Sequence, residues 1–352
     1  MTNQALPKKS RELLSGHSHE CQNLGLMLDK FAPWAGSGDG WDLTVNVLVR
    51  KANVQKLHAR TGGEAKGIWL DTDRKAKDGE TKSLFESPRV DEELMQHHRE
   101  RWKLQVQQGG GRAFKLELRE RLAAGLGASH VLETSLALDR NTGLPYLPAS
   151  SVKGLARAWG LIEVAAQLRI KIDPNLSVEK QPLNQLADTL ITEPQDTLFD
   201  AVNRIIHADS SADAQSYLEW FRFVFGWAGS KHDTGQAGSV CFTDAIYCAN
   251  EAPTFVKEVM TPHYVDYFDQ TGYPSEDKNP KPISFLTVER GQSFAFGIIP
   301  RADLREISED QTTTTALEIA EGWLISGLSR LGAGSKTSSG YGFFSNKPNH
   351  ID

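Results

Sequence analysis

The 352-residue sequence contains little cysteine and no long apolar run. Its three cysteines, Cys21, Cys241 and Cys248, are odd in number and never form a Cys-x-x-Cys pair. This scarcity argues against a disulfide framework and a thiolate zinc site, and it fits a reducing compartment. No stretch of roughly 18 apolar residues is present, so we expect no membrane span. The first residues also lack the apolar stretch of a secretory signal, and we expect a cytoplasmic protein.

The two common nucleotide-binding fingerprints are missing as well. Walker A requires Gly-x-x-x-x-Gly-Lys-Ser/Thr between a strand and a helix, but in the one similar stretch Ser335 precedes Lys336. The predicted order there is also reversed, because a helix comes before the stretch and a strand after it. The dinucleotide motif fails because Thr337 stands where its third glycine belongs. We expect no cofactor and no metal.

The net charge of −6 argues against a uniformly basic nucleic-acid binder, but the charge is segregated along the chain. Residues 50–77 carry eight cations against three acids, and residues 99–121 carry seven against three. Residues 173–220 carry nine acids against two cations. Such blocks predict a basic surface for a polyanion and a separate acidic surface. The alternative is an ordinary mixed surface that folding brings together.

The pattern of elements changes at the glycine run 109–111, which divides the chain. Residues 1–111 are predicted to be an N-terminal helical and basic extension, with helices at 10–32 and 91–107 and a turn at 34–41. Residues 112–352 are predicted to be the main domain, with an acidic, mostly helical insertion at about 171–215.

The main domain is predicted to alternate strands and helices. Its expected elements are strands at 114–118 and 131–138, a helix from 150, a short helix at 218–225, strands at 239–247, 283–288 and 294–298, a helix at 313–330 and a strand at 341–345. Ser150 or Ser151 should cap the first helix, and Val152, Leu155, Trp159 and Ile162 should form its buried stripe. The strands 283–288 and 294–298 are expected to pair as a hairpin.

This order is the β-α-β-β-α-β succession of an α+β, ferredoxin-like (RRM-like) fold. Ferredoxin-like sheets are a common platform for RNA, although a fold alone does not establish a function.

Two stretches carry the functional signal. The loop 331–342 is rich in glycine and hydroxyl residues around a single cation, Lys336, and small residues free backbone N–H groups to line an anion site. The helix start at 150–157 places two hydroxyls, Lys153 and Arg157 where the helix dipole favours an anion. Each stretch alone is also compatible with an ordinary turn or an ordinary capped helix.

The same stretches resemble the signatures of the RAMP superfamily of CRISPR proteins. Pro-Tyr-Leu-Pro-Ala-Ser-Ser-Val-Lys-Gly-Leu-x-Arg (145–157) is similar to the motif that opens the first helix in that superfamily. Gly-Ala-Gly-Ser-Lys-Thr-Ser-Ser-Gly-Tyr-Gly-Phe-Phe (332–344) is similar to its glycine-rich loop. Shorter stretches at 23–31, 225–226, 238–245, 259–264 and 282–288 narrow the resemblance to subunits of type III-B (Cmr) effector complexes. Ala149 departs from the usual glycine, and the basic stretch 50–82 and the acidic insertion match nothing in the family.

The resemblance implies a RAMP fold and a non-catalytic subunit that holds the 3′ part of a guide RNA (crRNA) near one end of an RNA-targeting effector complex in antiviral defence. The implied partners are crRNA, target RNA, the backbone RAMP subunit, the other terminal RAMP subunit and the small helical subunit. By position, the implied RNA contacts are Ser150, Ser151, Lys153, Arg157, Gly332, Gly334, Ser335, Lys336, Thr337, Ser338, Ser339 and Gly340. Contacts of this kind reach phosphate and sugar, so they are indifferent to base sequence.

Two enzyme classes compete with this interpretation. A metal-dependent CRISPR endoribonuclease of the same superfamily could use Asp244, Asp266 and Asp269, or the cluster His17, His19, Glu20 and Cys21. Side chains two apart do not face each other on a helix, so the histidine cluster would need a loop. A penicillin-binding serine enzyme shares the spacings Ser150-x-x-Lys153 and Lys336-Thr337-Ser338, but its middle Ser-x-Asn element is missing.

Overall fold

The computed structural model describes residues 3–4, 33–37, 40–43, 90–127, 134–207, 211–230, 233–262, 273, 282–301 and 311–351. The helix predicted at 10–32, the basic stretch 50–77 and the first part of the strand predicted at 131–138 lie outside these ranges. The turn predicted at 34–41 is instead a hairpin of β2 (Pro33–Ser37) and β3 (Gly40–Leu43), with β1 (Asn3–Gln4) pairing β2.

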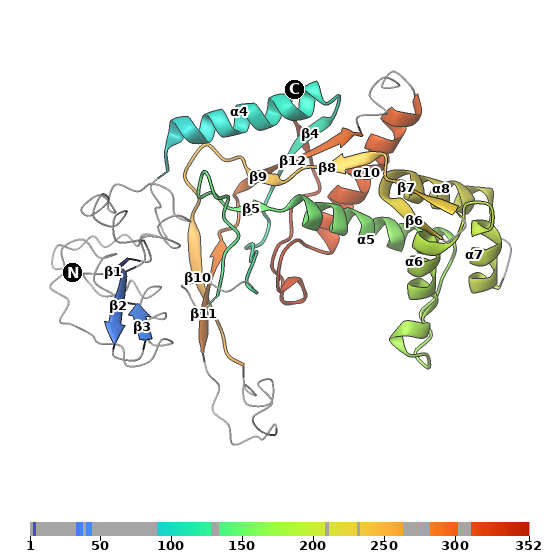
Figure 1. Ribbon diagram of the computed structural model, residues 1–352, viewed down its shortest axis with the longest axis horizontal. Helices are drawn as coiled ribbons and strands as arrows, with labels where there is room; N and C mark the ends of the chain where they lie inside the picture. Colours follow the sequence, from blue (N-terminus) through green and yellow to red (C-terminus); the bar gives the residue numbers. More distant parts are fainter. Residues whose placement is uncertain are drawn as a thin grey trace.

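A six-stranded antiparallel sheet is the centre of the main domain (Figure 1). Its order is β13 (Asn349–His350), β4 (Arg112–Glu117), β12 (Ser293–Pro300), β9 (Ala245–Tyr247) and β5 (Tyr146–Leu147), and β8 (Val240–Phe242) also pairs β12. The two central strands of the sheet are therefore β4 and β12. In this pair Phe114 of β4 lies opposite Phe296 of β12.

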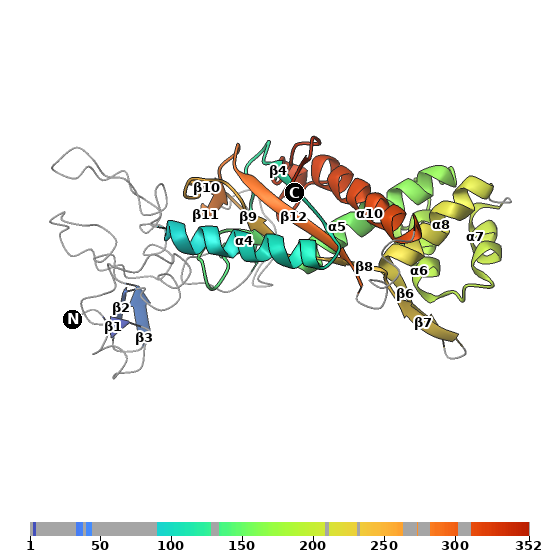
Figure 2. The same ribbon diagram turned by 90° about the horizontal axis from the view of Figure 1, so that it is seen from above.

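The two faces of this sheet bury different side chains, as the two-residue period of a strand requires. Phe114, Leu116, Phe294 and Phe296 belong to the large core beneath α5 (Ala149–Gln167) and α10 (Gln311–Arg330). The alternate residues, among them Ala113 and Ala295, pack against Trp102 and Val106 of α4 (Glu92–Gln108) on the opposite face (Figure 2). Gly297 brings α4 close, since a Cβ there would lie 2.7 Å from Val106 and 2.9 Å from Trp102.

The acidic insertion is helical, as predicted, and it extends from one end of α5 (Figure 1). It contains η3 (Val178–Lys180), α6 (Pro182–Thr192) and α7 (Leu198–Ile206). α8 (Ala212–Phe225) and the small hairpin of β6 (Gly226–Ser230) and β7 (Asp233–Ala237) follow it. Arg222 of α8 is 1% exposed and donates to the carbonyls of Thr189, Leu190 and Glu193. The Leu190 carbonyl has no amide four residues later to accept, because residue 194 is proline, whereas the Thr189 carbonyl also accepts the Glu193 amide at 3.0 Å.

The predicted hairpin of 283–288 with 294–298 is wrong. β11 (Ile283–Val288) pairs β10 (Phe255–Met260), a strand that the sequence reading missed, and the turn after β11 leads the chain into the central sheet as β12. Adjacency in the chain suggested the pairing, but the choice between partners depends on residues far apart in sequence.

Two local predictions in the main domain also need correction. The single strand predicted at 239–247 is two strands, β8 and β9. Residues 341–345 form no strand, because Gly342 has φ +79 and Phe344 makes only one bridge, to Leu118. The last strand is instead β13, at the next few residues, where it pairs β4.

The buried stripe of α5 is shifted from the predicted one. Ile162 is 37% exposed and Leu155 and Trp159 are half-buried, whereas Val152, Ala156, Gly160 and Val164 face the core. Small residues occupy that face because large aromatics of neighbouring helices fill the space, and a Cβ at position 160 would lie 3.0 Å from Trp323.

Candidate nucleic-acid interface

The antiparallel packing of α5 and α10 brings the two predicted stretches to the same end of this helix pair. Gly160 contacts Trp323, whereas five residues earlier Leu155 lies against Gly327, one turn further along α10. Arg330, the last residue of α10, stacks over Trp159 at 5.3 Å. The glycine-rich loop after Arg330 therefore lies at the same end of the pair as the start of α5.

The glycine-rich loop has a defined backbone rather than an open turn. Gly332, Gly334, Gly340 and Gly342 all have positive φ, between +78 and +94. At Gly334 a Cβ would lie 2.4 Å from the Ala123 carbonyl, and at Gly342 one would lie 1.9 Å from the Ala333 carbonyl. The glycines here let the loop lie directly on neighbouring backbone.

Lys336 is also left-handed, with φ 60 and ψ 30, which is unusual for a residue with a long side chain. Its ammonium group lies over the ring of Phe285 on β11, 5.3 Å from the centroid. A left-handed non-glycine residue costs roughly 1–2 kcal/mol and persists where the surroundings enforce it, often at functional positions. The ring contact holds the cation of the loop against the middle of the β10–β11 pair, where Phe285 lies opposite Glu258.

Only some backbone N–H groups of the loop donate hydrogen bonds to backbone carbonyls of the described chain. Ser335 donates to the Ala123 carbonyl at 2.6 Å, Ser339 to Lys336 and Gly340 to Thr337. The amides of Gly334, Lys336, Thr337 and Ser338 donate to no backbone carbonyl in the described part of the chain. Ser338, Ser339 and Gly340 are exposed. Donors of this kind can be directed at an anion.

The start of α5 differs from the prediction in one respect. Its N-cap is Pro148, and neither Ser150 nor Ser151 caps it with a side-chain hydrogen bond. Instead the exposed Asp244 carboxylate accepts the Ala149 amide at 2.6 Å, which is favourable at the positive end of the helix dipole. The hydroxyls of Ser150 and Ser151 are consequently left exposed at this end.

Lys153 and Arg157 face α8 rather than the loop. The Lys153 ammonium lies 3.5 Å from the Phe225 carbonyl at the end of α8, where the helix dipole favours a cation. The Arg157 guanidinium lies over the Phe221 ring at 5.6 Å, and its Nη2 is buried with no hydrogen-bond partner among the described residues. Both side chains are half-buried, so they have contacts within the protein besides any with a ligand.

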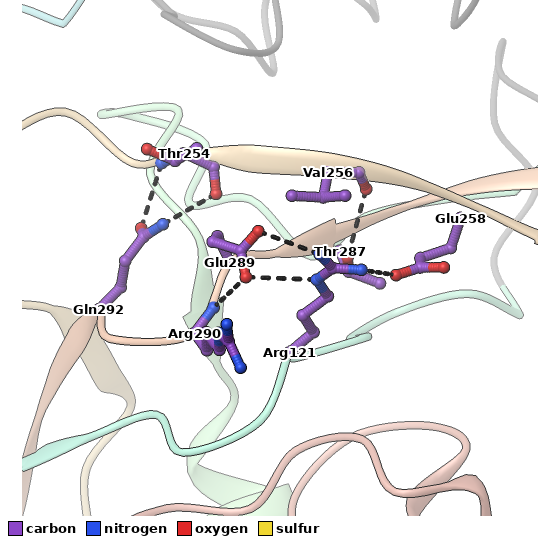
Figure 3. A network of polar contacts seen from close by, with 8 residues as sticks. All are labelled: Arg121, Thr254, Val256, Glu258, Thr287, Glu289, Arg290 and Gln292. Atoms are coloured by element: carbon purple, nitrogen blue, oxygen red, sulfur yellow. Dashed lines mark hydrogen bonds and ion pairs between the residues drawn. The ribbon is translucent and has the colours of Figure 1, made fainter.

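A polar network, which the sequence reading missed, joins the loop to the hairpin (Figure 3). The Arg121 carbonyl accepts the Gly342 amide at 2.7 Å, while the Arg121 guanidinium pairs with Glu258 of β10 and Glu289 after β11. Burial raises the pKa of Glu289, but hydrogen bonds from Arg121 and the Arg290 amide outweigh it, so the pKa lies below its ordinary value. Phe285 also meets Tyr341 edge-on at 6.0 Å.

The described residues offer little support for the two enzyme alternatives. Asp266 and Asp269 and the cluster His17, His19, Glu20 and Cys21 lie outside them, and Asp244 is occupied at the α5 terminus. Within the described ranges, no three of the His, Cys, Asp and Glu side chains gather as a metal site would require. Among the helices of those ranges, none combines the length and hydropathy of a membrane span.

A six-stranded antiparallel sheet backed by two helices, with a glycine-rich loop after the second helix, defines an α+β protein with a candidate anion-binding end. The model of the RAMP superfamily matches residues 60–345, well over half of the chain, and the protein belongs to this superfamily.

Within the superfamily the chain resembles Cmr6. The CRISPR system Cmr subunit Cmr6 of Pyrococcus furiosus is 29% identical over 244 residues, which are 65% of this chain and 66% of that protein. The match thus spans just under two thirds of the relative's length.

Two solved structures are also similar. The crystal structure of Cmr6 from Pyrococcus furiosus has 26% identity and a TM-score of 0.39, over 66% of this chain and 97% of that one. A chain in the cryo-EM structure of the type III-B Cmr-beta bound to cognate target RNA has 20% identity and a TM-score of 0.44, over 75% and 68% of the two chains.

Proposed function

We propose that this protein is a non-catalytic, guide-RNA-binding subunit of a type III-B CRISPR effector complex, acting in the cytoplasm. It holds the 3′ part of the crRNA by backbone contacts near one end of the complex. Its partners are the crRNA, target RNA, other RAMP subunits and the small helical subunit. The resemblance to Cmr6 supports the assignment to this kind of complex.

The observation that carries the proposal is the placement of Lys336. A left-handed lysine held over Phe285, next to backbone amides with no described backbone acceptor, forms a donor surface of fixed shape. That surface lies at the same end of the α5–α10 pair as the exposed Ser150 and Ser151. Phosphate and sugar oxygens fit such donors, and none of the contacts reads a base edge.

The order of strands in the sheet supports a ferredoxin-like fold. The domain runs through its elements in β-α-β-β-α-β order, with the first and third main strands central, and we propose the ferredoxin-like RAMP arrangement for residues 112–352. Residues 1–111 are then the extension, and about 171–215 the insertion.

The contacts of Lys153 and Arg157 divide the proposed RNA-binding residues into two groups. Lys336, Ser150 and Ser151 are placed to serve the ligand, whereas Lys153 and Arg157 also support the end of α8. We therefore expect Lys336→Gly, which relieves the left-handed strain as it removes the cation, to lower RNA retention at unchanged stability. Arg157→Ala should lower both.

The direct test is purification of the tagged full-length chain from its host, with measurement of the co-purified RNA and proteins. The proposal expects guide-length RNA of many sequences together with other RAMP subunits. Lys336→Ala should reduce the RNA, while Lys180→Ala, which removes an exposed lysine of the acidic insertion, should not. Absence of guide RNA, or RNA cleavage by the chain with Mg²⁺ that Asp244→Ala abolishes, contradicts the proposal.

A further inference from the structure

A groove of about 380 Å³ lies between α5, α8 and α10, away from the loop. Its walls are Tyr217 and Trp220 of α8 and Ile319 of α10, and Trp323, which is 3% exposed, lines it from the core side. Glu163 of α5 lies thirteen residues after Ser150, roughly 20 Å along the helix. The groove is therefore distinct from the proposed contacts at Ser150 and Ser151, while Arg157 lies about 9 Å from Glu163 along α5.

Packing within the described chain does not explain why a glycine, Gly322, lies at the open side of this groove. Gly322 lies in the interior of α10, its φ is not positive, and a Cβ there would meet nothing within 4 Å. Glycine in a helix interior is destabilising relative to alanine. At Gly160 and Gly327, by contrast, a Cβ would approach Trp323 or Leu155. A side chain of a binding partner that lies over position 322 would explain the glycine there, as Trp323 and Leu155 explain Gly160 and Gly327.

The negative charge at the groove favours a partner with a cationic side chain. Glu163 is the only charged residue among the described residues that line it, and one of its oxygens accepts the Trp159 indole N–H at 3.1 Å. The adjoining α8 belongs to the acidic block 173–220, with Glu219 exposed. A carboxylate beside aromatic rings binds a cationic side chain by charge and by cation–π contact. A phosphate backbone would be repelled.

We propose that this groove docks a protein partner, which places an apolar side chain over Gly322 and a lysine or arginine against Glu163. The inference does not depend on the RNA contacts proposed above. A fixed carboxylate, two aromatic walls and a helix surface without a side chain at its centre accept a ridge of a partner helix with one basic residue. Interface cores are enriched in aromatic residues and arginine, in keeping with this pairing.

The test places a photoreactive p-benzoyl-phenylalanine at position 216, where the exposed Ser216 lines the groove, in the full-length chain in its host. The matched control carries the same residue at position 104, where Leu104 is 52% exposed on α4. We expect a protein adduct from position 216 only, with a lysine or arginine next to the joined partner residue.

Two variants connect the adduct to the groove. Gly322→Leu fills the space while raising helix stability, so the melting temperature should rise and the adduct yield should fall at least roughly tenfold. Gly322→Ala gives a similar gain in stability with little filling and should keep most of the yield. Glu163→Arg should also remove the adduct, and changing the partner's basic residue to Glu should restore it.

Several outcomes overturn the inference. These are an adduct no stronger than at position 104, an adduct to RNA, an adduct to a second copy of this chain, or an undiminished yield in a folded Gly322→Leu variant. Guide RNA is measured in the same preparations. If the chain with the photoreactive residue at position 216 and no other substitution gives no adduct but retains guide RNA, the groove alone is rejected. An adduct without guide RNA rejects only the proposed function.

Discussion

At the scale of single residues, Gly334 and Gly340 separate two reasons for a glycine. Both have positive φ, so a side chain is strained at either position. At Gly340 a Cβ would meet nothing within 4 Å, whereas at Gly334 it would lie 2.4 Å from the Ala123 carbonyl, which also accepts the Ser335 amide. Gly340 therefore serves the conformation of the loop, and Gly334 also serves its contact with the 121–123 segment.

We expect Gly340→Ala to lower the free energy of unfolding by about 1 kcal/mol, because only the left-handed strain is added. Gly334→Ala should lower it by about 1–3 kcal/mol more, since the Ala123–Ser335 hydrogen bond must also break. Urea unfolding of the two variants against the parent chain measures the difference. Equal losses at the two positions would show that the loop does not depend on its contact with Ala123.

At the scale of elements, the insertion is attached to the domain through Arg222. This buried side chain donates to three carbonyls around the end of α6 and to the Gln195 amide oxygen, and it lies 5.2 Å from the Trp227 ring centroid. A single side chain of α8 thus binds the C-terminal end of α6 and holds that helix against the core.

Arg222→Met keeps much of the volume but leaves those carbonyls without their donor. We expect a loss of at least about 3 kcal/mol in the free energy of unfolding, and faster hydrogen exchange in α6 than in the central sheet. Arg204→Met, at an exposed position in the last turn of α7, is the matched control and should stay within about 0.5 kcal/mol of the parent. A similar small effect for both variants would contradict the structural role of Arg222.

The hairpin β10–β11 depends on charge in a way that pH can test. Because Arg121 keeps the pKa of Glu289 below its ordinary value, the pair stabilises the folded state above the ordinary carboxyl pKa. That contribution is lost as the pH falls through the lowered pKa of the folded state. The parent chain should therefore lose its stability advantage over Arg121→Gln below about pH 4. An advantage that is constant from pH 7 to pH 3 would exclude the ion pair as its source.

The sequence predicted elements better than it predicted their partners. The apolar stripes of α5 and α10 identified these helices within a few residues, and alternation identified β4. The pairing of β11 with β10, the cap from Asp244 and the pair of Arg121 with Glu289 were not predictable, because each joins residues far apart in the chain. For the same reason the motifs located Lys336 and Ser150, but the ring of Phe285 beneath Lys336 required the fold.

At the scale of the whole molecule, the acidic block and the glycine-rich loop lie in different parts of the fold. Five acids of this block, Glu179, Asp188, Asp200, Asp213 and Glu219, lie on the helices η3, α6, α7 and α8, whereas Lys336 lies just beyond the end of α10. A polyanion approaching the loop therefore avoids most of the acidic surface. Under the proposed function, such separation explains how a chain with net charge −6 holds RNA through a few local cations.

This arrangement predicts how salt should affect RNA retention. Affinity for a single strand falls with salt according to the number of phosphates neutralised, at a slope of about −0.7 for each. Lys336→Gly removes one cation, while relief of the left-handed strain of roughly 1–2 kcal/mol offsets the added chain entropy and the lost ring contact. The variant should keep the parent's stability and show a slope shallower by about 0.7, equally for guides of unrelated sequence. Binding measured from low to high salt on two such guides checks this, with Lys180→Gln as the control for a lysine outside the interface. A changed preference between the guides would mean that Lys336 reads bases, and an unchanged slope would mean that backbone amides alone hold the strand.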